Sequence, residues 1–126
     1  MEKVMEAKSS FIEVLKDRTK QLSIQVIRLC GQLQKTDEAR IIGRQLLRSA
    51  SSAAANYRAT CRARSKAEFY AKLSIVIEEM DEGLFWLELL EESGIYQSTS
   101  LKTIKDEAET LVRILSKARK TVSTAK

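Results

Sequence analysis

The 126 residues contain no proline and only four glycines. Antiparallel sandwiches and barrels need turn-forming residues at short intervals, so this chain does not fit an all-β architecture. Its apolar residues instead recur at three- and four-residue spacing, which predicts amphipathic helices. Apolar residues make up 44% and charged residues 31% of the chain, a balance typical of a globular protein rather than a disordered one.

The apolar pattern divides the chain into four helical segments, at about residues 10–34, 37–64, 66–93 and 99–122. Short connections make consecutive helices antiparallel neighbours. We therefore expect residues 1–126 to form a single domain of the all-α class, an antiparallel up-down-up-down four-helix bundle. Each segment carries one apolar stripe for the core, which begins at Phe11 in the first segment.

Three positions mark helix ends. Asp37 is a candidate N-cap for the second segment, and Ser65 with Glu68 has the spacing of a capping box before the third. Gly94 suits the residue that follows the third helix, because glycine adopts the left-handed conformation required there.

Histidine is absent, which excludes Ser-His-Asp and Cys-His catalysis and histidine-ligated metals. We predict no catalytic, cofactor-binding or metal-binding residue and no small-molecule substrate, and so no enzyme. Cys30 and Cys61 are expected to be buried free thiols, with a disulfide as the alternative. No apolar run is long enough to span a membrane and no signal peptide is evident, so the predicted location is cytoplasmic.

Charge is segregated along the sequence. Residues 36–66 carry seven basic and two acidic side chains, whereas residues 67–92 carry one basic and eight acidic. Five arginines of the second segment share an 80° sector of the helix: Arg40, Arg44, Arg48, Arg58 and Arg62. This arginine stripe has two interpretations. It binds the phosphates of RNA or DNA, or it pairs with the acidic third segment.

The small residues 49–55 of the second segment predict close packing of a neighbouring helix, with a ligand cavity as the alternative. Another face of this segment carries small polar residues: Gln45, Ser49, Ser52 and Asn56. That face is either solvated or a helix contact, and we include it among the candidate oligomer-interface residues.

The third segment has a second apolar set that a bundle core does not need. Four apolar and two acidic side chains define this outer face: Ile75, Phe85, Trp86, Leu89, Glu78 and Glu82. Exposed apolar clusters of this kind are more often interfaces than ordinary surface. A contact between this face and the basic second segment of another copy is heterologous, and repeated with rotation it closes into a ring.

Five stretches carry a family resemblance: QLLRSASSAAANYR at 45–58, RARSKAEF at 62–69, KLSI at 72–75, EEMDE at 78–82 and WLELL at 86–90. They resemble the bacterial four-helix bundle protein family, also called 23S rRNA intervening-sequence proteins. The resemblance implies a ring-shaped homopentamer. A structurally similar relative is the accessory protein of diversity-generating retroelements, which implies nucleic acid and a reverse transcriptase as partners. Many family members carry an Ile-Pro-Ala-Asn-Ile-Ala-Glu-Gly pattern here. This chain instead carries Ala-Asn-Tyr-Arg at 55–58 and resembles the subgroup of the family that has this second pattern.

Three functions follow. The first is a non-enzymatic homo-oligomeric protein that contacts the RNA or DNA backbone through the arginine stripe. The second is a protein–protein adaptor without a nucleic-acid role, whose arginines pair with acidic residues. The third is an enzyme, which the absence of histidine and of an activated nucleophile disfavours.

Overall fold

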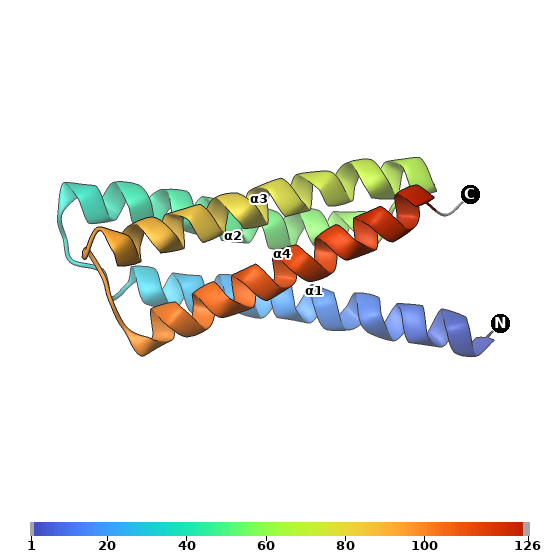
Figure 1. Cartoon of the computed structure of the whole chain (residues 1–126), viewed down its shortest axis with the longest axis horizontal. Coiled ribbons are helices and arrows are strands. Elements are labelled where there is room, and N and C mark those ends of the chain that lie inside the picture. The colour runs from blue at the N-terminus through green and yellow to red at the C-terminus, as the bar shows by residue number, and fades with distance from the viewer. Residues whose placement is uncertain (1, 125–126) are drawn as a thin grey trace.

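The computed structural model describes the backbone of residues 2–124 and the side chains of residues 11–122. Four helices follow one another: α1 (Glu2–Cys30), α2 (Asp37–Thr60), α3 (Lys66–Glu92) and α4 (Thr99–Thr124). They run alternately up and down the long axis, so that the start of α1 and the end of α4 lie at the same end of the bundle (Figure 1). The prediction of an all-α antiparallel four-helix bundle is confirmed.

The ends of the first two helices differ from the predicted ones. α1 begins at Glu2 rather than near residue 10, because Glu, Lys, Ala and Met favour helix even without an apolar stripe. It ends at Cys30, before the Gly31 turn, rather than near residue 34. α2 ends at Thr60 rather than near residue 64. The amides of Arg62 and Ala63 donate to carbonyls three residues earlier, instead of four as in an α-helix.

Side-chain caps fix where the later helices begin. The hydroxyl of Thr36, not the carboxylate of Asp37, accepts the amide of Ala39 at 3.2 Å, since Thr36 has the extended backbone of an N-cap. The hydroxyl of Ser65 accepts the amide of Glu68 at 3.1 Å, as predicted. Gly94 follows α3 with φ of +78°, which confirms its predicted left-handed role.

All four helices contribute to one apolar core. Leucines are its most frequent side chains: Leu15, Leu22, Leu29, Leu46, Leu73, Leu87, Leu90, Leu101, Leu111 and Leu115. Full burial of one such side chain stabilises the fold by about 1.5–3 kcal/mol. The expectation for Phe11 is wrong: it is 48% exposed, because the first half of α1 diverges from α4 (Figure 1).

Each helix packs against two others, and the four resulting helix–helix contacts, here called seams, are not equally extensive. α2 and α3 pack most extensively and α1 and α4 least. Small residues face each other across the α2–α3 seam: a Cβ atom at Gly83 would lie in ordinary contact with Cβ of Ser49, at 3.7 Å. Ser49, Ala50 and Ala53 are buried, so close packing is the correct interpretation of that part of the small-residue run.

Candidate functional site

One arginine of the stripe pairs across the α2–α3 seam. The guanidinium of Arg48 lies 2.8 Å from Oε1 of Glu82 and 3.2 Å from Oε2 of Glu79. The hydrogen bond to Glu82 raises the pKa of Arg48 and, in return, lowers the pKa of Glu82. Arg48 is therefore engaged inside the chain.

The other four arginines of the stripe do not reach α3. Arg40 pairs within its own helix, 3.5 Å from Asp37. Arg44, Arg58 and Arg62 are exposed and form no side-chain hydrogen bond or ion pair with another described residue. Pairing with α3 is thus confirmed for Arg48 alone, and phosphate binding by Arg44, Arg58 and Arg62 stays a prediction.

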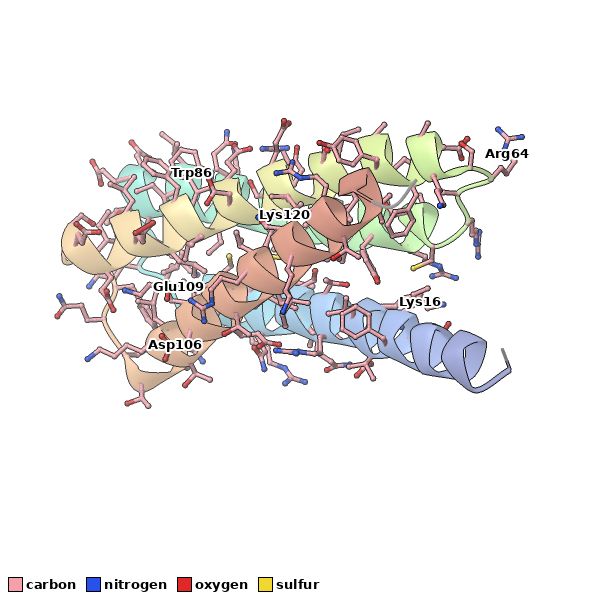
Figure 2. All side chains as sticks on the ribbon, turned by 45° about the vertical axis from the view of Figure 1, so that its right-hand side comes forward. Lys16, Arg64, Trp86, Asp106, Glu109 and Lys120 are labelled. Atoms are coloured by element: carbon pink, nitrogen blue, oxygen red, sulfur yellow. The ribbon has the colours of Figure 1, made fainter. Side chains whose placement is uncertain are left out.

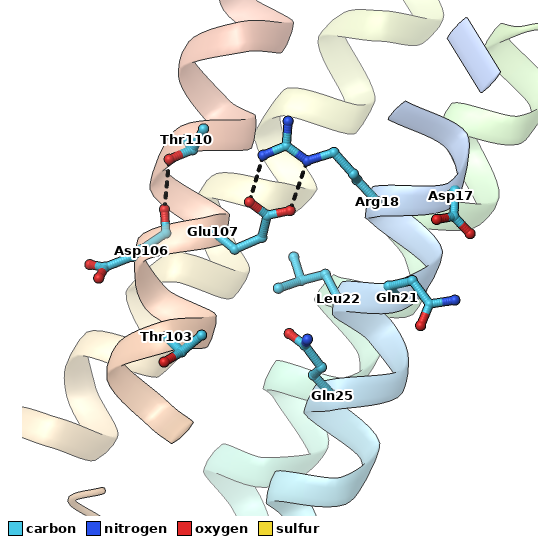
Figure 3. A pocket seen from close by; sticks show the side chains of 9 residues that line it. All are labelled: Asp17, Arg18, Gln21, Leu22, Gln25, Thr103, Asp106, Glu107 and Thr110. Carbon is cyan, nitrogen blue, oxygen red and sulfur yellow. Dashed lines mark hydrogen bonds and ion pairs between the residues drawn. The ribbon is translucent and has the colours of Figure 1, made fainter. Parts of the chain in front are cut away.

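A bidentate ion pair crosses the loose α1–α4 seam. Arg18 donates to both carboxylate oxygens of Glu107, at 2.6 and 2.9 Å, and this hydrogen bonding raises the pKa of Arg18. Figure 3 shows the pair bridging an open groove, with Asp17 and Asp106 directed away from it. The groove has polar walls but holds no nucleophile paired with a base, so we assign it to helix packing.

The α3–α4 seam also carries an ion pair. Nζ of Lys105 lies 2.8 Å from Oε1 of Glu91, and this contact raises the pKa of Lys105. Further along, Arg119 donates to the hydroxyl of Ser74 at 3.4 Å and lies over the ring of Tyr70. Sequence reasoning missed these pairs, because helix periodicity does not reveal which charges face each other across a seam.

The apolar side chains predicted for the outer face of α3 are exposed or half-buried. Ile75 is 46% and Phe85 51% exposed, while Trp86 and Leu89 are half-buried. The rings of Phe85 and Trp86 meet edge to face, 4.9 Å apart between centroids. Figure 2 shows Trp86 on the side of α3 turned away from α1.

The two acidic residues of this face differ. Glu78 is exposed, whereas Glu82 is held by Arg48 and also accepts the indole N–H of Trp86 at 3.4 Å. A contact with another molecule would therefore find Glu78 free to pair and Glu82 already engaged.

The small polar face of α2 needs a correction. Ser49 is completely buried against α3 of the same chain, so it belongs to internal packing and not to a subunit interface. Gln45, Ser52 and Asn56 are half-buried beside it. The amide of Asn56 donates to Ser52, one turn earlier in α2, rather than to another helix.

Both cysteines are free thiols, as predicted, but each is half-buried rather than buried. Burial raises the pKa of Cys30 and of Cys61, which keeps both thiols protonated at neutral pH. Burial also raises the pKa of Tyr57, whose ring lies in the core. These groups are less reactive than their free counterparts, which is the opposite of what a nucleophile needs.

Two further findings concern the described residues. Among them, no three His, Cys, Asp or Glu side chains are grouped so as to hold a metal ion. None of the helices in this part of the chain has the length and hydrophobicity that crossing a bilayer requires.

The chain is similar to known proteins in both sequence and fold. A search of curated proteins found no match. Among solved structures, the chain is similar to a protein of unknown function from the S23 ribosomal protein family of Bacteroides thetaiotaomicron VPI-5482. The two are 27% identical, the match covers 84% of this chain and 98% of that chain, and the TM-score is 0.77. Residues 12–117 match the family described as 23S rRNA-intervening sequence protein. With four antiparallel helices and a match over most of its length, the chain belongs to the 23S rRNA-intervening sequence protein family.

Proposed function

We propose that this chain is a non-enzymatic, homo-oligomeric protein that binds the backbone of RNA or DNA. The observation that carries the proposal is the set of three exposed arginines on α2 without partners among the described residues: Arg44, Arg58 and Arg62. Guanidinium groups bind phosphate in a bidentate manner, and free ones on one helix face suit a polyanion. The aromatic residue among them, Tyr57, is buried in the core, so contacts to the backbone are favoured over base stacking.

Self-association is the second part of the proposal. Ile75, Phe85, Trp86 and Leu89 form an apolar surface on α3 that the described residues cover only in part. A ring, pentameric as the family resemblance implies, brings several arginine sets onto one surface. Binding through many weak phosphate contacts then gains affinity without new interactions.

A charge-removing variant tests the nucleic-acid contact. We expect Arg44→Gln/Arg58→Gln to lower affinity for an RNA duplex at least about tenfold, because two charge-assisted phosphate contacts are lost. The dependence of log K on log salt falls by about two units per protomer. Fluorescence anisotropy at several salt concentrations measures both quantities.

The matched control is Arg28→Gln/Arg113→Gln, which removes two exposed arginines from α1 and α4. This control retains most of the wild-type affinity if the α2 arginines are the binding groups. Wild-type protein that binds RNA and DNA no better than a neutral protein at low salt contradicts the proposal.

A protein–protein adaptor is the second candidate. The pairing of Arg48 with Glu79 and Glu82 favours it, since part of the stripe serves packing alone. An adaptor purifies as an assembled particle without nucleic acid, which the 260/280 nm absorbance ratio reports.

A further inference from the structure

The α1–α2 seam differs from the other three in its charges. Among the described residues, ion pairs join α2 to α3, α3 to α4 and α1 to α4, but none joins α1 to α2. The side-chain hydrogen bonds across this seam are neutral: Ser23 donates to the carbonyl of Ala50 and Cys30 to that of Gly43. Basic side chains flank the seam on both sides, with no carboxylate of the facing helix paired to them.

One solvent-open cleft lies at the end of the seam next to the α1–α2 linker. Its volume is about 330 Å³, and its lining includes the basic side chains of Lys35, Arg40 and Arg44 and the apolar side chains of Leu33 and Leu47. No acidic residue lines it. Lys35 and Arg44 form no side-chain interaction with another described residue, so two cations here are free for a ligand.

A second cleft, of about 460 Å³, lies further along the same seam. The small side chains of Ala54 and Ala55 leave it open, and Lys16, Lys20 and Arg58 line it together with Glu13 and Asp17. Glu13 holds Lys16 at 3.0 Å. Lys20 and Arg58 have no ion-pair partner among the described residues, so this cleft also offers one lysine and one arginine.

The two clefts lie on one line. Arg44 and Arg58 are 14 residues apart in α2, which places them on nearly the same helix face and about 21 Å apart along its axis. Successive phosphates of one strand in a duplex are about 3.4 Å apart along the axis, so roughly six nucleotides bridge this separation. A duplex lying along the seam can therefore present phosphates to both clefts at once.

We infer that the α1–α2 seam is the phosphodiester-binding face, with Lys20 of α1 and Lys35 of the linker forming the wall opposite Arg44 and Arg58. This inference rests on the proposed function and deepens it, because it assigns two binding clefts and brings in lysines outside the arginine stripe. The alternative occupant is the acidic α3 of another copy. Nucleic acid fits better, since four α3 carboxylates are paired within the chain: Glu68, Glu79, Glu82 and Glu91.

The test removes the lysine wall and leaves the α2 arginines intact. Lys20→Gln/Lys35→Gln is compared with Lys102→Gln/Lys117→Gln, a control that removes two exposed lysines from α4. Labelled RNA and DNA duplexes of one sequence are titrated between about 50 and 200 mM salt. We expect the seam variant to bind at least about tenfold more weakly, and its slope of log K against log salt to fall by about two units per protomer. The control should show less than half of each change.

Light scattering on the same samples gives the mass, and circular dichroism confirms that each variant is folded. Lysine acetylation followed by mass spectrometry supplies a readout without substitution. Bound duplex is expected to protect Lys20 and Lys35, but not Lys102 and Lys117.

Three results overturn the inference, and they are distinguishable. Seam and control variants that bind equally well, with wild-type protein binding tightly, exclude this face while the proposed function stands. Wild-type protein that binds neither duplex removes the proposed function and the inference together. A seam variant with reduced mass shows that the lysines belong to a subunit contact instead.

Discussion

Arg44 and Arg48 are four residues apart on α2, yet their environments differ. Only Arg48 lies within reach of the carboxylates of Glu79 and Glu82, and so only Arg48 is neutralised inside the chain. The sequence places both arginines in one stripe correctly. It does not show which of them faces an acidic helix, because that depends on the rotation of α3 about its own axis.

The Glu82 contact predicts a specific pH dependence. A pKa below the ordinary glutamate value means that the ionised side chain stabilises the fold at neutral pH. This contribution is lost as the pH falls through the lowered pKa. We expect Glu82→Gln to melt at a lower temperature than wild type at pH 7, with the difference shrinking as the pH falls below the ordinary glutamate pKa of about 4.3.

Thermal unfolding followed by circular dichroism at a series of pH values checks this. Asp81→Asn is the control, since Asp81 is exposed and forms no ion pair among the described residues. A Glu82→Gln difference that is equal at pH 3 and pH 7 contradicts the assignment.

At the scale of helices, two buried glycines meet different surroundings. Gly83 faces Ser49 with ordinary spacing, so an alanine methyl group fits there. At Gly43 a methyl group would lie 3.0 Å from Cδ1 of Leu33, which forces that side chain to move. Both positions lie inside helices, where alanine is preferred over glycine by about 1 kcal/mol.

Substitution at these two glycines should therefore have unequal effects. We expect Gly83→Ala to raise the free energy of unfolding by about 1 kcal/mol, from helix propensity alone. Gly43→Ala should raise the free energy of unfolding by less than this, or lower it, because crowding at Leu33 offsets the gain in helix propensity. Urea denaturation of both variants measures the difference. If Gly43→Ala is as stabilised as Gly83→Ala, the close contact with Leu33 is not a constraint.

At the scale of the whole molecule, the outer face of α3 and the α1–α2 seam are two different surfaces. The outer face of α3 has Ile75 and Phe85 in water, whereas the α1–α2 seam is basic. We propose that the first surface joins copies of the chain and that the second binds the ligand. The two surfaces are therefore separable by mutation.

Light scattering tests this separation. We expect wild-type protein to have several times the 14.3 kDa mass of one chain, and Ile75→Glu/Phe85→Glu to reduce it to that of one chain. Burying two new carboxylates in an apolar contact is strongly unfavourable. Val14→Glu/Ile27→Glu adds the same charge to exposed apolar positions of α1 and should leave the mass unchanged. Wild-type protein that remains a single chain at high concentration excludes self-association through this face.

The sequence by itself determined the helices, their antiparallel order, the Ser65 and Gly94 signals and the outer face of α3. These depend on local propensity and on a period of 3.6 residues, which a single chain segment already contains. Only the tertiary structure decided that Arg48 is paired, that Ser49 is buried against Gly83, and that Lys20 and Lys35 flank the α1–α2 clefts. Such contacts depend on how each helix is rotated and tilted against its neighbours. That arrangement is set by the packing of all four apolar stripes together, and no segment specifies it alone.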